Sequence, residues 1–323
     1  MLKLAELYAP VADDIQCSAD IFRDELISDQ GFISDLCQHI GQFHGKMLRP
    51  AILLLSARAC GELRPEHHTL AAVVEIVHIA TLVHDDVLDD ADIPRRAATV
   101  NRLWGNERAV LLGDFLISRA YHLCSSLDSQ YASRLIGKTT NTVCEGELMQ
   151  VANRENFELS EPEYFDIITR KTASLIGTCC RLGAYYAGAD PRTVRRMEEF
   201  GVSLGIAFQI TDDVLDLTGD EAEAGKSLGR DVEKGKLTLP LIYYLGRCTP
   251  AERDRLLTIL RADDPQRHRR VARTMLSADC IEYARDAAYA HIKKAVQALD
   301  ELPLSDARSS LAAMAEFVVT RRQ

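Results

Sequence analysis

Residues 79–89 of the chain are IATLVHDDVLD, and residues 206–216 are IAFQITDDVLD. Both stretches place the same pentapeptide, DDVLD, after apolar residues, with Ile-Ala at the same offset before it. In an α-helix, residues four apart lie about 40° apart around the axis and about 6 Å along it. Each stretch therefore predicts a helix with two aspartates on one face, and the repetition predicts two equivalent walls of one site.

The carboxylate pairs are Asp85 with Asp89 and Asp212 with Asp216. Like charges at this spacing destabilise an isolated helix, so two such pairs predict a compensating cation. Oxygen ligands favour Mg²⁺, which takes one or two protein carboxylates and completes its shell with water and phosphate oxygens. A single acidic helix end is as readily explained by solvation, whereas two identical copies favour a magnesium-bridged diphosphate clamp.

Helix-start signals predict an all-α fold. Ser160 with Glu163 and Thr249 with Glu252 both fit a capping box, with a hydroxyl at the cap and a carboxylate three residues later. Sustained two-residue alternation of apolar residues, the signature of strands, is nearly absent. Several prolines stand at or just before the start of apolar-periodic stretches, as helix starts favour. These are Pro50, Pro65, Pro162, Pro191, Pro250, Pro265 and Pro303.

No linker rich in proline, glycine or serine divides the chain. We therefore predict that residues 1–323 form one domain of antiparallel helices, with two fused bundles as the alternative. The stretches 90–105, 153–162 and 218–236 are expected to be loops. Pro240 is expected to lie inside a helix and to kink it.

Composition limits the classes of partner. The net charge is −10 and the pI about 5.4, which argues against a general binder of nucleic acid. The basic run at residues 267–273 is more typical of a solvated helix face. Nine scattered cysteines favour reduced thiols in a cytoplasmic protein. The acidic residues near Met1 argue against a secretory signal, and no apolar run approaches the ~20 residues of a membrane span.

Basic residues flank both acidic clusters. Arginine offers a planar fork for phosphate oxygens, and lysine offers a mobile point charge. Each of these side chains alone is more often a surface residue, but together they favour a diphosphate site. They are Lys46, Arg49, Arg95, Arg96, Lys171, Lys226 and Lys236.

The order of motifs resembles the trans-isoprenyl (polyprenyl) diphosphate synthases, in particular the long-chain octaprenyl and heptaprenyl type. The motifs are G-K-x-x-R-P, H-x(5)-HDDxxDD, an arginine pair with T-V-N, K-T, Q-I-x-DDxxD and G-K-x-x-G-x-D-x-x-x-G-K-x-T-x-P, between about Gly45 and Tyr244. The resemblance implies a single-domain helical bundle with a central substrate cavity. It also implies a homodimer and several Mg²⁺ ions per active site.

The resemblance also implies a role for each matching residue. The metal positions are Asp85, Asp89, Asp212 and Asp216. The catalytic positions are these four together with Asp86, Asp213 and Lys171. Isopentenyl diphosphate is held by Lys46, Arg49, His78 and Arg95. The allylic diphosphate is held by Arg96, Lys171, Thr172, Gln209, Lys226 and Lys236.

Two departures from the family pattern affect the basic residues. Pro94 replaces the first arginine of the usual R-R-G, and Arg96 takes the place of the glycine. We expect Arg96 to substitute for the missing arginine. His44 and Met47 replace the first glycine and the arginine of the usual G-G-K-R.

The implied reaction is condensation of isopentenyl diphosphate with geranyl, farnesyl or geranylgeranyl diphosphate. Metal ions and cationic side chains stabilise the departing diphosphate, and the isopentenyl double bond attacks the resulting allylic cation. Val77, Ala80 and Thr81 are expected to line the product tunnel. Because Ala80 is small where short-chain enzymes place a ring, we expect a product longer than farnesyl, with Leu148 and Met149 as possible deeper determinants.

Three alternatives remain open. A class I terpene cyclase also ionises a diphosphate at a DDxxD helix, but the second DDVLD argues against it. A metal phosphohydrolase is suggested by His84-Asp85, without further convincing ligands. The third alternative is the catalytic subunit of a heteromeric synthase. Separately, a long apolar product is expected to involve transient membrane contact during release.

Overall fold

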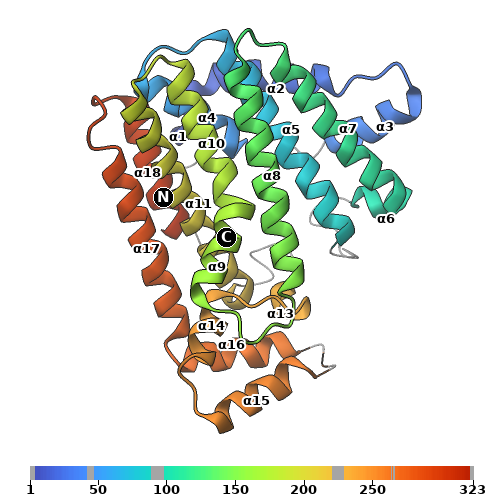
Figure 1. Ribbon diagram of the computed structural model, residues 1–323, viewed down its shortest axis with the longest axis vertical. Helices are drawn as coiled ribbons and strands as arrows, with labels where there is room; N and C mark the ends of the chain where they lie inside the picture. The colour runs from blue at the N-terminus through green and yellow to red at the C-terminus, as the bar shows by residue number, and fades with distance from the viewer. Residues whose placement is uncertain are drawn as a thin grey trace. The chain divides into compact units, whose positions relative to one another are not determined.

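The computed structural model describes residues 4–41, 47–88, 98–219, 229–262, 264 and 266–320. Within these residues the chain forms helices and no strand, which confirms the all-α prediction (Figure 1). The helices divide into two compact units. Unit 1 contains residues 1–141, 175–201 and 298–314, and unit 2 contains residues 142–174, 202–297 and 315–323. The single domain over residues 1–323 stays a prediction.

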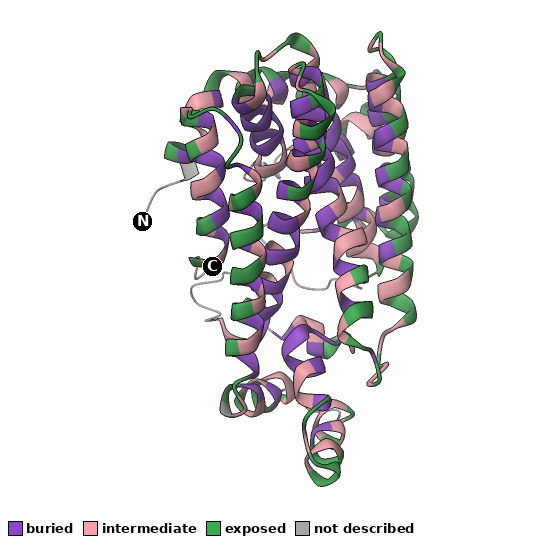
Figure 2. Cartoon of the chain, turned by 60° about the vertical axis from the view of Figure 1, so that its left-hand side comes forward, coloured by how far each residue is buried: buried purple, intermediate pink, exposed green. Residues whose placement is uncertain are grey.

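Unit 1 is built around one helix, α5 (Pro65–Leu88), that is apolar on most sides. α5 is buried from Leu70 to Val77 and packs against α2 (Ala12–Glu25), α4 (Leu48–Cys60) and α7 (Asn106–Ser125). A helix that is apolar all round belongs in a core, and Figure 2 shows buried positions continuing over successive turns of the inner helices.

Shorter helices and shared helices complete unit 1. The remaining helices of unit 1 alone are α1 (Leu4–Tyr8), the 3₁₀ turn η1 (Ala9–Val11), α3 (Gly31–Gly41), α6 (Val100–Trp104) and, beyond its first residue, α10 (Ser174–Tyr186). Three helices contribute residues to both units: α8 (Gln130–Ala152), α11 (Pro191–Thr218) and α18 (Asp306–Thr320).

Unit 2 contains α9 (Glu161–Ile168), which continues directly into a π-helical turn, η2 (Thr169–Ala173). The C-terminal part of α11 lies in the same unit. Further helices follow: α13 (Arg230–Glu233), α14 (Leu239–Leu245), α15 (Pro250–Leu260), α16 (Arg267–Ser277) and α17 (Cys280–Ala298). α14 packs against both α9 and α16.

Both capping boxes are confirmed. At α9, the Ser160 N–H donates to Glu163 Oε2 at 2.8 Å while the Glu163 N–H donates to Ser160 Oγ at 3.4 Å. Thr249 and Glu252 make the same reciprocal pair at the start of α15. These local patterns predicted helix starts because they satisfy N–H groups that have no partner inside the helix.

Two local predictions were wrong. Pro240 is the second residue of α14 and kinks nothing, because a proline in the first turn lacks only an N–H that has no intrahelical partner. The loops predicted at 90–105 and 218–236 contain the short helices α6 and α13. Residues 89–97 and 220–228 lie outside the described residues.

The nine cysteines are all free thiols, and five of them are buried. None of the helices in the described ranges has both the length and the apolar composition that crossing a membrane would require.

Candidate active site

The second acidic cluster lies near the end of α11, in unit 2. Asp213 is buried there, and both of its carboxylate oxygens accept a hydrogen bond. The Tyr164 hydroxyl on α9 donates to Oδ2 at 2.6 Å, and Gln209 Nε2, one turn earlier on α11, donates to Oδ1 at 2.8 Å. The Thr172 hydroxyl on η2 donates to Gln209 Oε1 at 2.8 Å. The structure thus joins three predicted site residues, Thr172, Gln209 and Asp213, in one hydrogen-bonded chain.

These hydrogen-bonded residues lie in a strongly acidic environment. Burial raises the pKa of Asp213 well above its ordinary value, and the neighbouring charges of Asp231 and Asp212 raise it further, while hydrogen bonds from Tyr164 and Gln209 act in the opposite direction. Burial, followed by the charge of Asp213, raises the pKa of Tyr164. Tyr164 is therefore a neutral hydrogen-bond donor at neutral pH.

Asp216 is also buried, and it is held by the backbone of the segment that follows the cluster. The Asp231 N–H donates to Asp216 Oδ2 at 3.1 Å, and the Gly229 N–H donates to the Asp216 carbonyl oxygen at 2.8 Å. The Lys236 N–H donates to the Asp231 carbonyl oxygen at 2.8 Å. Asp231 thereby links the backbone of Lys236 to the second cluster.

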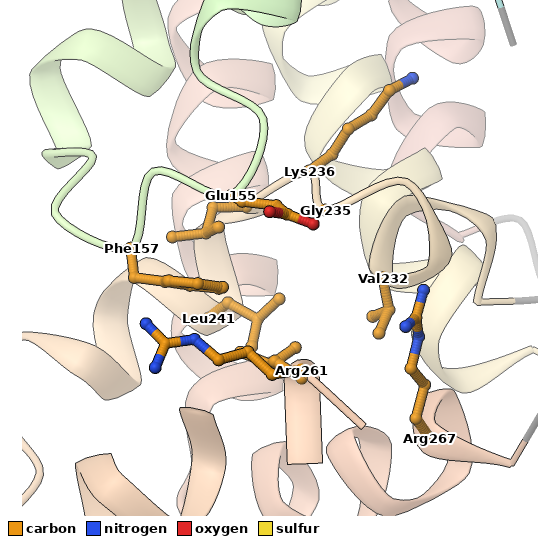
Figure 3. Close-up of a pocket in the computed structure, with 10 residues that line it drawn as sticks. Glu155, Phe157, Val232, Gly235, Lys236, Leu241, Arg261 and Arg267 are labelled. Carbon is orange, nitrogen blue, oxygen red and sulfur yellow. The ribbon is translucent and has the colours of Figure 1, made fainter. Parts of the chain in front are cut away.

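The same segment forms one side of a small pocket (Figure 3). Glu155 and Gly235 meet at its edge, where the Glu155 N–H donates to the Gly235 carbonyl oxygen at 2.7 Å. Phe157 and Leu241 supply apolar lining, whereas the Lys236 side chain extends away from the other labelled residues. The pocket therefore supports the backbone before Lys236 and does not enclose its ammonium group.

Lys171 and Thr172 lie on the π-helical turn η2. The Lys171 ammonium group donates to Gln150 Oε1 at 2.8 Å and forms an ion pair with Glu147, both on α8. π-Helical turns inside α-helices change the direction of the side chains they carry and occur frequently at functional sites. The turn therefore sends Lys171 toward α8 and Thr172 toward α11.

Two glycines make room for this turn. A Cβ atom on Gly146 of α8 would lie 2.5 Å from the Lys171 backbone nitrogen, and one on Gly205 of α11 would lie 2.5 Å from Ala173 Cα. Both contacts are to backbone or to a fixed Cα atom, so a flexible side chain cannot relieve them. η2 is therefore held closely between α8 and α11.

The first acidic cluster lies in the last turn of α5, in unit 1. Asp85 and Asp86 are partly exposed, and Asp89 lies outside the described residues. The Asn101 side chain donates through Nδ2 to the Asp86 carbonyl oxygen at 3.0 Å. His84 Nε2 lies 3.1 Å from the Val110 carbonyl oxygen, so its ring joins α5 to α7.

Arg49 on α4 lies in the electrostatic field of Glu75, a 3 % exposed carboxylate on α5. Burial lowers the pKa of Arg49, and the negative charge of Glu75 acts in the opposite direction. Burial likewise raises the pKa of Glu75, and the positive charge of Arg49 opposes that rise. Among the described residues, Arg49 Nε and Glu75 Oε2 have no hydrogen-bond partner. The predicted phosphate-binding arginine therefore carries a buried counter-charge.

The predicted tunnel wall is on α5. Val77 and Ala80 are buried, at 1 % and 0 % exposure, while the partly buried Thr81 donates its hydroxyl to the His78 carbonyl oxygen at 2.7 Å. The wall itself stays a prediction. Leu148, suggested as a deeper determinant, is 70 % exposed on α8, so its side chain does not line the interior of the chain.

Several predicted site residues lie outside the described residues. They are Lys46, Asp89, Arg95, Arg96 and Lys226. Their roles stay predictions.

The donor set suits a magnesium ion bound partly through substrate. In the part of the chain that the structure describes, no three His, Cys, Asp or Glu residues converge into a metal-binding group. Mg²⁺ does not need such a cage, because one or two carboxylates suffice when phosphate and water complete its shell. Asp212 and Asp216, one turn apart beside the buried Asp213, are the described residues of this cluster that would supply oxygen ligands to such an ion.

Sequence reasoning missed Tyr164, Glu147 and Glu75, because their roles depend on contacts with residues distant in the chain. Asp231 was quoted as part of the G-K-x-x-G-x-D motif but was given no role. A local signal did exist for Gly146 and Gly205. A glycine inside a helical pattern is unfavourable unless another backbone approaches closely.

Comparison with known proteins gives concordant results. The family described as Polyprenyl synthetase matches residues 30–277. The octaprenyl diphosphate synthase of Escherichia coli K12 is 35% identical over 300 residues, which cover 92% of this chain and 93% of that protein. The short chain isoprenyl diphosphate synthase of Methanothermobacter thermautotrophicus is 34% identical over 288 residues, covering 88% and 89%.

A crystal structure shows the same architecture. The polyprenyl synthase of Caulobacter crescentus CB15, solved with calcium and isoprenyl diphosphate, superposes with a TM-score of 0.93 at 32% identity and covers 99% of this chain and 98% of that one. The hydrogen-bonded second DDVLD cluster, the match over residues 30–277 and these near-complete alignments lead to one conclusion: the chain belongs to the polyprenyl synthetase family.

Proposed function

We propose that the chain condenses isopentenyl diphosphate with geranyl, farnesyl or geranylgeranyl diphosphate. It is a trans-prenyltransferase, a polyprenyl diphosphate synthase whose products are medium- or long-chain. The observation that carries the proposed site is the chain from Thr172 through Gln209 to Asp213, which joins the K-T motif to the second aspartate cluster.

In this proposal the allylic diphosphate lies against the wall formed by α11 and η2. Mg²⁺, held by Asp212 and Asp216 and by Asp85 and Asp89, would neutralise the diphosphate and favour its departure. Lys171, Lys226 and Lys236 add positive charge around the leaving group. The Lys171 ammonium group is held at α8 by its ion pair with Glu147.

The reaction needs no protein nucleophile. The C1–O bond of the allylic substrate breaks, and both electrons leave with the diphosphate. The double bond of isopentenyl diphosphate supplies the electron pair of the new C–C bond, and a proton passes to the released diphosphate. The protein contributes by holding the two substrates together and stabilising the leaving group.

The second substrate is assigned to the basic residues of unit 1 and the segment after α5. Lys46, Arg49, His78 and Arg95 would hold the diphosphate of isopentenyl diphosphate. Buried Glu75 supports this assignment, since its charge opposes the effect of burial on the pKa of Arg49.

We further propose a cytoplasmic homodimer with transient membrane contact during product release. Large apolar side chains are exposed on α7 at Val110, Leu111 and Tyr121, and on α8 at Leu148 and Val151. Helices that expose such residues commonly contact a partner. Gel filtration combined with an activity assay of the purified chain alone separates a homodimer from the catalytic subunit of a heteromer.

The reaction is tested by incubating the protein with Mg²⁺, labelled isopentenyl diphosphate and each allylic primer, followed by chromatography of the products. We expect all-trans products longer than farnesyl diphosphate, and Ala80→Phe should shorten them because a ring would block the predicted tunnel. A cyclic hydrocarbon from the allylic substrate alone would identify a terpene cyclase, and a strict farnesyl product would overturn the predicted length.

A further inference from the structure

Tyr164 is a buried residue that belongs to none of the motifs recognised in the sequence. It lies in the first turn of α9, is 3 % exposed, and has its hydroxyl 2.6 Å from Asp213 Oδ2. A buried hydroxyl bonded to a carboxylate contributes more than an ordinary hydrogen bond, and its removal leaves that oxygen unsatisfied. Tyr164 therefore restricts the orientation of Asp213.

The restriction extends along the hydrogen-bonded chain. Both Asp213 oxygens accept hydrogen bonds, so the Gln209 amide presents its nitrogen to Oδ1 and its oxygen to Thr172. Once the Gln209 amide is oriented in this way, the Thr172 hydroxyl must donate to it. Each group in the chain thus has one hydrogen-bonding role, set from the Tyr164 end.

The helix that carries Tyr164 is itself held in place. Its start is closed by the capping box of Ser160 and Glu163. Phe165 packs against the ring of His291. The hydroxyl of Tyr164 is therefore presented from a fixed helix and not from a loop.

From this geometry we propose that Tyr164 is a positioning residue for the allylic diphosphate site, acting through Asp213 and Gln209 on Thr172. The inference rests on the proposed function, in which Gln209 and Thr172 adjoin that diphosphate. It assigns Tyr164 no contact with the substrate. The chain would lose alignment without the hydroxyl, while the residues assigned to isopentenyl diphosphate would be unaffected.

The test is Tyr164→Phe, with Tyr283→Phe as a matched control. The Tyr283 hydroxyl of α17 bonds both oxygens of Glu161 at 2.8 and 2.9 Å. Both substitutions therefore remove one hydroxyl that bonds a carboxylate in unit 2, but Glu161 is not a site residue. The KM for farnesyl diphosphate is measured at saturating isopentenyl diphosphate, and the KM for isopentenyl diphosphate is measured at saturating farnesyl diphosphate. We expect Tyr164→Phe to raise the KM for farnesyl diphosphate about ten-fold and that for isopentenyl diphosphate less than about two-fold. Tyr283→Phe should leave both unchanged.

A second variant protects the test against a folding defect. Gln209→Met removes the other donor to Asp213. If both residues act through that carboxylate, the double variant should raise the KM for farnesyl diphosphate by less than the two single effects combined. Calorimetric titration with farnesyl diphosphate and Mg²⁺ should show the same weakened binding. Equal changes in both KM values, additive effects, or identical behaviour of Tyr164→Phe and Tyr283→Phe would overturn the proposal. Normal turnover by wild-type protein and Tyr283→Phe would leave the proposed function standing.

Discussion

The two DDVLD segments have the same sequence but different surroundings. In the first, Asp85 and Asp86 are partly exposed at the end of α5, and the bond from Asn101 goes to a backbone oxygen. In the second, Asp213 and Asp216 are buried, and their carboxylates accept bonds from side chains and backbone. An identical pentapeptide therefore specifies identical chemical groups, while neighbouring helices decide how far each group is buried.

The largest expected effect tests whether both segments act in the reaction. Asp85→Ala and Asp212→Ala should each reduce kcat by about 10³-fold or more, because each removes charge that stabilises the departing diphosphate through metal. The measurement is turnover of labelled isopentenyl diphosphate at saturating substrates. Asp254→Ala, on the exposed face of α15, is the control and should leave turnover unchanged.

Unequal losses would show that one segment contributes more to the stabilisation of the transition state than the other. Near wild-type turnover in both variants would instead refute the assignment of the clusters to the active site.

The next effect concerns the packing that holds the second segment. Gly146→Ala and Gly205→Ala should each lower the free energy of unfolding by about 1–3 kcal/mol, because the new Cβ would lie 2.5 Å from atoms of η2. Gly137→Ala on α8 is the matched control, because its Cβ would meet only Tyr121 at 3.9 Å. It should stabilise the helix by about 0.5–1 kcal/mol.

Thermal or denaturant unfolding measures all three variants. If the three alanines behaved alike, the close approach of α8 and α11 to η2 would not be what holds the turn.

A smaller effect distinguishes the side-chain amide of Gln209, near the second segment, from that of Asn101, near the first. Gln209→Met should raise the KM for the allylic substrate roughly ten-fold, because it removes a bond to the Asp213 carboxylate. Asn101→Leu should cost about 1 kcal/mol of stability with little change in that KM, because Asn101 bonds the α5 backbone. Steady-state kinetics and unfolding of both variants make the comparison. A selective allylic KM effect from Asn101→Leu would break it.

Features that depend on residues close together in the sequence could be predicted, whereas features that depend on contacts between distant residues could not. The helix starts at Ser160 and Thr249 were predictable because each depends on four consecutive residues. The second aspartate cluster was predictable because its chemistry is repeated in the sequence. Tyr164 was not, since it lies 49 residues from Asp213 in the chain and meets it only after α9 packs near α11. The π-helical turn at Lys171 depends in the same way on Gly146 and Gly205.

The smallest expected effect compares how the helices behind the two segments begin. α5 begins beside His67, whose Nδ1 accepts the Arg64 N–H at 2.8 Å, and burial lowers the pKa of His67 below 6.5. α9 is capped by Ser160, whose hydrogen bonds lower the pKa of Glu163 below 4.5. In both cases the unfolded chain binds the proton more tightly, so each contribution to stability is present above the unfolded pKa and lost as pH falls through the folded value.

The two helices should therefore lose stability in different pH windows. The His67 contribution should decline below about pH 6.5, and the Glu163 contribution only below about pH 4.5. Tm measured from pH 7.5 to 3.5 should have a shallower slope in the upper window for His67→Gln and in the lower window for Glu163→Gln. If each variant's Tm ran parallel to the wild-type curve across both windows, these groups would not be the source of the pH dependence. The start of α5, which leads to the first segment, would then be no more sensitive to mild acid than the start of α9.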